Sequence, residues 1–569
     1  MACTTILVGK TASYDGSTMI ARNDDSGAGK YTPKHLVTIP AGDNKETVYR
    51  PVLSVTEIEV PKEHLKFTCM PDALKGAGIW AASGINECNV AMTATETITS
   101  NPRVQGADPL NFVYVDDDGK NSPSTADQIF GQPESLKASE KHKKPAGIGE
   151  EDMVFLVLPY VHTAREGILR LGSLLEKYGT YEMNGIGISD PDEIWWLETI
   201  GGHHWIAKRV PDDRYVIMPN QLGIDSFDLD DAYGDKKNHM CSADLYEFMK
   251  KYHLDYCIGH GLAGLVKEKK GKFNPRTAFG SHDDSDHIYN TPRAWYSLKY
   301  FNPHSFKWEG EDANYLPDSD DLPWSLKPEK KITVEDVKYV LSTHFQGTPY
   351  DPYFKPEIPR NGIEDLRGRF RSVGVNRNDF VAVLQLFGDK GNFKGYLNRA
   401  QNADIDKKDL NGTSNKAQNA DDSEPFKGQS DGQAAGKAMS IMWFSFASNV
   451  FNALVPYLPA GTCVDDYFGA TGPRISTDTF YWSERLIAAL ADASYSACAI
   501  HIERYQDAVA GKSWSIIDEY LESSRDTAAA DAFNEKIAAM VKDETDHTLM
   551  NVLNETSNHM KNCFARSDA

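Results

Sequence analysis

The sequence predicts an α+β fold in which antiparallel strands form sheets that helices cover. Three observations indicate it. Residues 185–221 alternate short β-rich runs with Asp-Pro, Gly-Gly and Pro-Asp-Asp turns, which is typical of successive antiparallel strands. Residues 162–178 place apolar side chains on one helical face, and this pattern stops at Gly179. After Phe480 the pattern becomes helical and alanine-rich, so helices are expected to pack against the sheets.

The first predicted strand begins at a cysteine near the start of the chain. Cys3 stands directly ahead of the β-branched and apolar run 4–8, which predicts a strand. A second strand, 17–21, follows a turn at Asp15-Gly16, and Asp-Gly is a strong hairpin signal. Cys3 is therefore expected at the rim of a sheet.

Removal of Met1 and Ala2 would give Cys3 a free α-amino group beside its thiol. A thiol becomes a good nucleophile when a neighbouring group takes its proton, and an N-terminal amine is a recognised activator. Cys3 could then supply both a nucleophile and a base. The alternative is an ordinary buried cysteine at the start of a strand.

Four polar residues end the second predicted strand. Arg22-Asn23-Asp24-Asp25 place a cation and two carboxylates next to the start of the first strand if the hairpin is in register. Charges in that position could tune both the thiol and the amine.

The remaining elements follow from local patterns. Residues 79–97 predict two short strands around a turn, the apolar run 153–158 predicts a strand, and residues 334–345 predict a helix. Polar or irregular insertions are expected near 270–330 and 399–435. We expect a catalytic domain at 3–470 and a helical C-terminal region at 471–569 packed on it or on another subunit.

These motifs resemble a known family. Cys-Thr-Thr, a glycine-containing turn and Arg-Asn-Asp-Asp are similar to the start of N-terminal nucleophile hydrolases, specifically the dipeptidase A family of cysteine dipeptidases. Penicillin V acylase and bile salt hydrolase resemble it more distantly. The block 185–221, with Gly-Gly-His-His-Trp, Arg-Val-Pro-Asp-Asp and its closing asparagine, extends the resemblance. The resemblance implies a four-layer αββα fold, with two stacked antiparallel sheets flanked by helices.

The resemblance also implies site residues. The expected catalytic residues are Cys3, Arg22, Asp25, Asn220 and Arg371, and the expected substrate-binding residues are Asp24, Glu96, Thr97 and Arg369. For several of them, a purely structural or surface role remains as the alternative. Glu96 could be a solvated carboxylate at a strand end, Arg369 and Arg371 could be surface arginines, and Asn220 could only cap a turn.

Composition excludes some classes of protein. A formal charge of −22 and a pI near 5.2 favour solubility and argue against a nucleic-acid surface. No stretch is long and apolar enough to span a bilayer, and the N-terminus lacks the regions of a signal peptide. Eight scattered cysteines without a C-x-x-C pair suggest a reducing cytosol.

Two motifs suggest a metal or a cofactor only weakly. His203 and His204 are adjacent, and neighbouring strand residues point to opposite faces, so they are not expected to share one ion. Residues 259–264 match G-x-G-x-x-G but lack a clear βαβ context. We therefore expect neither a metal nor a cofactor.

The predicted function is hydrolysis of dipeptides in the cytoplasm by a homo-oligomeric enzyme. The resemblance implies a thioester acyl-enzyme on Cys3 and an oxyanion donor at Asn220. Two alternatives stay open: an amidase that acts on non-peptide C–N bonds with the same nucleophile, and a non-catalytic interaction protein similar to the secernins.

Overall fold

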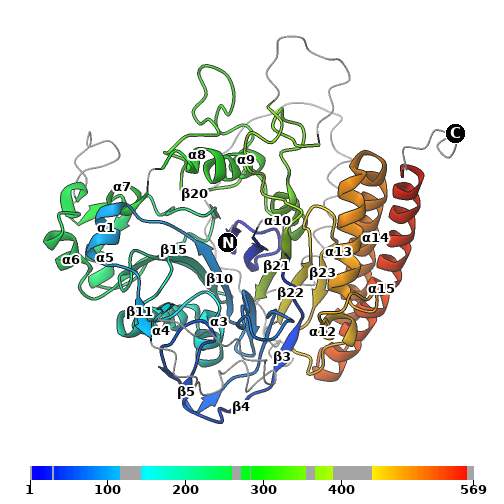
Figure 1. The fold of residues 1–569 in the computed structure, drawn as a ribbon, viewed down its shortest axis with the longest axis horizontal. Helices are drawn as coiled ribbons and strands as arrows, with labels where there is room; N and C mark the ends of the chain where they lie inside the picture. Colours follow the sequence, from blue (N-terminus) through cyan, green and yellow to red (C-terminus); the bar gives the residue numbers. More distant parts are fainter. Residues whose placement is uncertain are drawn as a thin grey trace, which may run out of the picture.

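The computed structural model describes residues 3–27, 31–115, 142–258, 271–281, 283–353, 366–388 and 439–560. Two large antiparallel sheets form its centre (Figure 1). The first has seven strands in the order β20-β16-β1-β2-β21-β22-β23. Their bounds are β20 Ser325–Leu326, β16 Tyr215–Met218, β1 Thr4–Val8, β2 Thr18–Asp25, β21 Asn378–Phe387, β22 Met439–Phe446 and β23 Val455–Tyr457.

The second sheet has eight strands in the order β18-β15-β14-β13-β10-β9-β8-β3. Their bounds are β18 His239–Cys241, β15 Trp205–Val210, β14 Ile194–Thr199, β13 Asn184–Ser189, β10 Ala91–Thr97, β9 Ser83–Asn86, β8 Phe67–Cys69 and β3 Val37–Ile39. The strands expected in 79–97 and 185–221 are therefore confirmed.

The two sheets pack face to face. Strand β2 contacts β10 and β13 of the second sheet, and β9 contacts β21 and β22 of the first. Every residue of β1 and β2 is buried, because these central strands are covered on both faces. Apolar side chains of the two sheets belong to one continuous core. The hairpin expected at the N-terminus is present, with Thr5 opposite Arg22, although β2 extends to Asp25.

Helices cover the outer faces of both sheets (Figure 1). Helices α3 (Met153–Val157) and α4 (Ala164–Tyr178) pack on the second sheet, and α9 (Thr291–Phe301) and α10 (Val334–Ser342) pack on the first. Helices α13 (Phe480–Ala493), α14 (Tyr495–Leu521) and α15 (Thr527–Asn558) contact β22 or β23. The α+β class and the C-terminal helical region are confirmed.

Short elements complete the described chain. The two-stranded sheets pair β4 (Gly42–Asp43) with β7 (Glu63–His64), β5 (Val48–Tyr49) with β6 (Ile58–Glu59), β11 (Phe112–Val115) with β12 (His142–Pro145) and β17 (Phe227–Asp228) with β19 (Lys272–Phe273). The short helices are α1 Pro102–Ala107, η1 Leu158–Tyr160, α5 Leu229–Tyr233, α6 Leu245–Lys251, η2 Asp255–Cys257, α7 Pro275–Phe279, α8 Asp286–Tyr289 and α12 Asp466–Gly469.

One secondary-structure prediction is wrong. The run 153–158 is helix α3 continuing into η1, not a strand. All five residues of α3 are buried, and a continuous apolar run does not distinguish a buried strand from a buried helix. The helix after it is as predicted. In α4 the Thr163 hydroxyl accepts from the Glu166 N–H, and Gly179 ends the helix with a φ of 71°.

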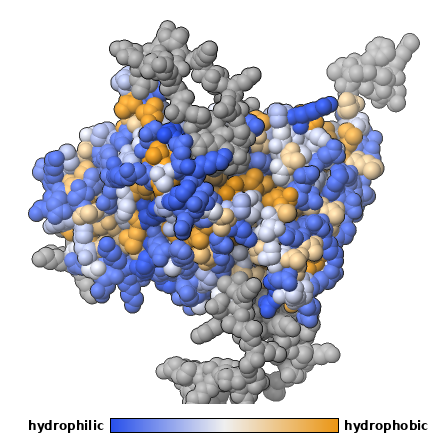
Figure 2. Space-filling model, turned by 90° about the horizontal axis from the view of Figure 1, so that it is seen from below, coloured by the Kyte–Doolittle hydropathy of each residue, from blue (hydrophilic) through white to orange (hydrophobic). Residues whose placement is uncertain are grey.

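The face shown in Figure 2 is mostly hydrophilic, as expected for an acidic chain without long apolar stretches. Apolar residues form smaller patches on it. Among the described residues, no helix combines the length and apolarity needed to cross a membrane. The G-x-G-x-x-G motif at 259–264 and the insertion at 399–435 lie outside the described residues.

His203 and His204 do not point to opposite faces of a strand, contrary to the prediction. Both residues lie in the turn before β15, not in a strand. Their Nδ1 atoms converge on one carboxylate: His203 lies 3.2 Å and His204 2.7 Å from the oxygens of Asp108, which also accepts both backbone N–H groups. The pair therefore anchors α1 to the second sheet through a carboxylate.

Asp108 gives a test of this anchor. Burial by itself raises its pKa, but hydrogen bonds from His204 and His203 outweigh burial and lower the pKa to about 2. Because the pKa is lower in the folded state, ionised Asp108 stabilises the protein at pH values above the unfolded pKa of about 3.9. This stabilisation is lost as the pH falls toward 2. We expect Asp108→Asn to lower the free energy of unfolding by about 2 kcal/mol at pH 7. The loss should become smaller as the pH is lowered below about 4, and denaturant unfolding at a series of pH values measures it.

Asp244 provides the matched control. It lies 3.3 Å from the other nitrogen of His204, with 72% of its side chain exposed. Exposed pairs contribute little, so Asp244→Asn should leave the free energy of unfolding nearly unchanged. Equal losses for the two variants at pH 7 would show that Asp108 is not an anchor.

Candidate active site

Cys3 immediately precedes β1, an inner strand of the first sheet. Its side chain is fully buried, and β1 is paired on one side with β16 and on the other with β2. Because Thr4 pairs with Asn23, Cys3 comes next to the last residues of β2. The charged end of β2 is thereby brought to the sulfur.

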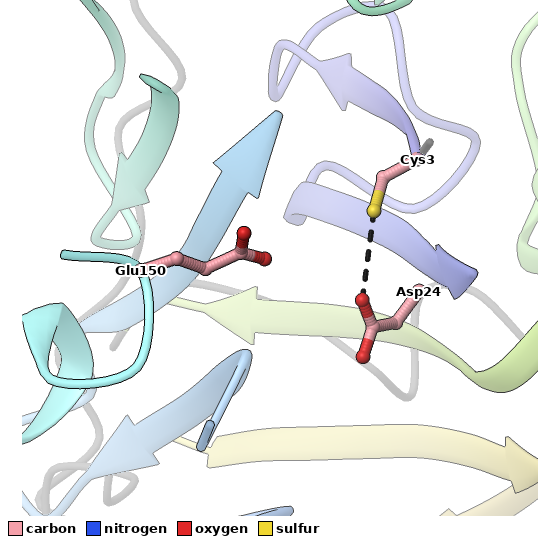
Figure 3. Close-up of side chains that lie close together, drawn as sticks. All are labelled: Cys3, Asp24 and Glu150. Carbon is pink, nitrogen blue, oxygen red and sulfur yellow. Dashed lines mark hydrogen bonds between the residues drawn. The ribbon is translucent and has the colours of Figure 1, made fainter. Parts of the chain in front are cut away.

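The Arg22 guanidinium connects the groups around the thiol. Its Nη2 lies 2.9 Å from Cys3 Sγ, 3.1 Å from Asp24 Oδ1 and 2.7 Å from Glu150 Oε1. The thiol also lies 3.5 Å from Asp24 Oδ1, to which it donates. Figure 3 shows the Cys3, Asp24 and Glu150 side chains pointing toward one another. A buried cation at this distance stabilises a thiolate relative to a thiol.

A second buried cation, Lys34, forms an ion pair with the other carboxylate oxygen of Asp24. Its Nζ lies 3.2 Å from Asp24 Oδ2 and 2.6 Å from Asp72 Oδ1, and it donates to the Trp80 carbonyl. Burial raises the pKa of Asp24, but Lys34 and Arg22 outweigh it and hold that pKa below its ordinary value. Burial raises the pKa of Asp72 to about 6 despite Lys34. Lys34 and Arg22 together therefore favour the ionised form of Asp24 beside the thiol.

The same cluster offers a possible set of metal ligands. Among the described residues, Cys3, Asp24 and Glu150 bring one ligand atom each to within 4.8 Å of the others. Nη2 of Arg22, however, lies within hydrogen-bonding distance of all three atoms. The positive charge at their centre is thus a guanidinium, and an ion there would have to displace it.

Arg293 lies on the backbone side of Cys3. Its Nη1 donates to the Cys3 carbonyl and, at 2.8 Å, to Thr4 Oγ1, while its Nη2 lies 2.7 Å from Asn220 Oδ1. Arg293 is fully buried in the first turn of α9. Cations are unfavourable at a helix N-terminus. An arginine at that position was therefore a signal of another role, inside a region expected to be only an insertion.

Asn220 follows the end of β16 and is linked to Cys3 through Arg293. Arginine can only donate, so the side-chain oxygen of Asn220 faces the guanidinium and its NH₂ group faces the other way. The Asn220 carbonyl accepts from Asn290 Nδ2 at 3.1 Å. The side-chain oxygen is thereby fixed toward Arg293, and the NH₂ group points away from it.

Asp25 and Arg371 form an ion pair beside this cluster. Arg371 Nη2 contacts Asp25 Oδ2, and Asn378 Nδ2 donates to Asp25 Oδ1 at 3.0 Å. The pairing of β2 with β21 is irregular between Asp24 and Asp25, so Asp25 is aimed at Arg371 while Asp24 contacts the thiol. Arg369 is exposed, with its guanidinium over the Phe370 ring.

The last two expected residues lie at the end of β10. Glu96 pairs with Gly185 and Thr97 with Asn184 of β13, beyond an irregularity that follows Ala94. Strand β10 packs on β2, which carries Arg22 and Asp24. The side chain of Glu96 is outside the described part of the structure.

The site thus combines several expected residues with three that sequence reasoning missed. Cys3, Arg22 and Asp24 are in direct contact, and Asn220 is joined to Cys3 by one guanidinium. The missed residues are Lys34, Glu150 and Arg293. Lys34 and Glu150 come from loops without a local signal for burial.

The fold and the site define an α+β protein with a buried cysteine between charged partners at the start of its central strand. A model described as "Peptidase family C69" matches residues 2–394 and 429–508. The chain is 42% identical over 612 aligned residues to a dipeptidase of Bifidobacterium longum, covering 100% of both chains.

Two further relatives agree. Probable dipeptidase A of Streptococcus pyogenes is 41% identical over 570 residues, with 100% of both chains covered. Dipeptidase A of Lactobacillus helveticus is 36% identical, covering 87% of this chain and 82% of its own. The chain belongs to peptidase family C69. The resemblance to the dipeptidase A family and the expectation of a cysteine-type peptidase are thereby confirmed.

Proposed function

We propose that this protein hydrolyses dipeptides with the thiol of Cys3 after Met1 and Ala2 are removed. The observation that carries the proposal is the contact of 2.9 Å between Arg22 Nη2 and Cys3 Sγ within a buried cluster of charges. It is supported by relatives named dipeptidase that align over the full chain. An ordinary core cysteine differs: Cys69 is buried in the apolar core, and burial raises the pKa of its thiol.

The reaction takes place in two halves. The α-amine of processed Cys3 takes the thiol proton, and Sγ bonds to the carbonyl carbon of the peptide. The carbonyl oxygen gains charge and accepts a hydrogen bond from the Asn220 NH₂ group. The C–N bond then breaks, and its nitrogen takes the proton from the amine as the second amino acid leaves. Water, deprotonated by the same amine, hydrolyses the thioester and restores the thiol.

The other residues position these groups. Arg22 stabilises the thiolate, and Asp24 with Lys34 holds Arg22 in place. Arg293 fixes the carbonyl of Cys3 and the oxygen of Asn220. The ion pair of Asp25 with Arg371 fixes the end of β2 beside these groups. Substrate contacts are proposed for Asp24, Glu96 and Thr97, while Arg369 is exposed in this structure.

The proposal extends to the architecture. Two face-to-face sheets with helices outside each support the four-layer αββα arrangement of N-terminal nucleophile hydrolases. We propose residues 3–470 as the catalytic domain and residues 471–569 as a helical region packed on it, in a cytoplasmic homo-oligomer. Contacts of α13, α14 and α15 with the first sheet support that packing.

A substrate panel tests the function. Purified protein should hydrolyse unblocked dipeptides, and it should not hydrolyse N-acyl amides at a comparable rate. Faster turnover of N-acyl amides would identify a non-peptide amidase instead. Absence of turnover with both classes would favour an interaction protein without catalysis.

Asn220 gives a prediction of its own. As an oxyanion donor, its loss in Asn220→Leu or Asn220→Asp should lower kcat by about 10²–10³-fold while the melting temperature changes little. Neither replacement can donate a side-chain N–H. Steady-state kinetics and thermal unfolding of the two variants check this. A lower melting temperature with nearly normal kcat would show that Asn220 only stabilises the turn after β16.

A further inference from the structure

Arg377 and Tyr289 form a hydrogen-bonded pair near the proposed nucleophile, Cys3. The proposed reaction does not use this pair. Arg377 immediately precedes β21, and its Nη2 donates to the Tyr289 hydroxyl at 3.0 Å. Its Nη1 donates to the Ser26 carbonyl at 2.5 Å. A guanidinium has more N–H donors than these two bonds use. Arg377 is half-buried, so its remaining donors can meet a ligand.

Two separate connections place Arg377 next to Cys3. Ser26, which holds its guanidinium, follows Asp25 at the end of β2. On the other side, the Tyr289 ring lies 5.2 Å from the guanidinium carbon of Arg293, which binds the Cys3 carbonyl. Burial, the largest influence, lowers the pKa of Arg377. Tyr289, Asp25 and Cys3 outweigh burial and raise that pKa above its ordinary value, which agrees with a position near Cys3.

Among the residues that the structure describes, no carboxylate forms an ion pair with Arg377. Its hydrogen-bond partners there are a backbone carbonyl and a phenol. Arg371, by contrast, is paired with Asp25. A half-buried cation is stabilised by an anionic partner, and arginine matches a carboxylate with two parallel N–H groups.

The groups around Cys3 come from two parts of the molecule. Glu150 reaches the thiol from the loop before α3, whereas Tyr289 and Arg293 come from α8 and α9. Figure 1 shows α8 and α9 at the top of the molecule and α3 toward the bottom. An extended dipeptide spans only about 7 Å. A carboxylate one residue beyond the cleaved bond would therefore lie close to the attacked carbon.

We propose that Arg377, oriented by Tyr289, binds the free C-terminal carboxylate of the substrate. This inference rests on the proposed function and specifies its substrates as peptides with one residue after the cleaved bond. In the leaving amino acid, the nitrogen faces Cys3 and the carboxylate faces Arg377. A longer peptide would place an amide where the carboxylate is required, and its next residue would meet Tyr289.

The test compares a dipeptide with its C-terminal amide. Wild-type protein should prefer alanyl-alanine to alanyl-alaninamide in kcat/KM. Arg377→Met should lower kcat/KM for the acid about 10- to 100-fold and leave that for the amide nearly unchanged. Arg377→Lys keeps the charge without the paired donors and should retain part of the preference. Arg504→Met, at an exposed position on α14, is the matched control and should behave as wild type.

Three results would contradict the proposal. An equal loss for acid and amide in Arg377→Met and Arg377→Lys would mean that the residue only supports the fold. A preference for the acid that survives in Arg377→Met would place the carboxylate elsewhere and overturn this inference alone. No turnover of either compound by wild-type protein would overturn the proposed function and this inference with it.

Discussion

Replacement of Cys3 by alanine is expected to abolish hydrolysis completely and to leave the chain uncut before position 3, so that Ala2 stays attached. The reason is that Cys3 alone can offer a thiol and a terminal amine in one residue. Its thiol is also held 2.9 Å from a buried guanidinium. Dipeptide hydrolysis followed by a ninhydrin or coupled assay, together with the mass of the variant, measures both effects.

Other cysteines provide the controls. Cys463 is exposed and Cys88 is partly exposed, and burial raises the pKa of Cys88. Cys463→Ser and Cys88→Ala should therefore keep wild-type activity, and iodoacetamide inactivation should track alkylation of Cys3. Residual activity of Cys3→Ala above that of a mock preparation would exclude Cys3 as the nucleophile.

Replacement of Arg22 by methionine is expected to have the second-largest effect. The variant would leave the carboxylates of Asp24 and Glu150 buried without the cation that lies between them. Removing one partner of such a buried group typically costs about 3–5 kcal/mol, and loss of thiolate stabilisation should lower kcat/KM at least about 10²-fold. Denaturant unfolding and steady-state kinetics measure the two losses.

The pH dependence identifies the cause. Without Arg22, protonation of a carboxylate relieves the repulsion, so the deficit in unfolding free energy should shrink as the pH falls from 7 to 5. Arg474→Met, at an exposed position, controls for loss of an arginine. If Arg22→Met had wild-type stability at pH 7, the charged cluster would not require the guanidinium.

The sequence predicted most strands because their signals are local. Alternation of β-rich runs with Asp-Pro and Gly-Gly turns marks β13, β14, β15 and β16 without reference to distant residues. Helix α3 was mistaken for a strand because a short, fully buried apolar run has no amphipathic period. The error lies where burial on all sides removes the pattern.

The candidate site was predictable only in part for a related reason. Arg22 and Asp24 lie on the strand next to Cys3, so local pairing brings them to the thiol. Glu150 and Arg293 arrive from positions 128 residues after Arg22 and 290 residues after Cys3. Only the packing of the two sheets and of α9 determines that these residues meet at Cys3, and no local pattern encodes it.

The intact mass of purified, active protein tests the central claim most directly. If Cys3 is an N-terminal nucleophile, active molecules should lack both Met1 and Ala2, and a substrate-like electrophile should add once, at the new N-terminal cysteine. Loss of Met1 alone would leave Ala2 blocking the amine. Full activity in a preparation in which every molecule retains Ala2 would contradict the role of the Cys3 amine as the base.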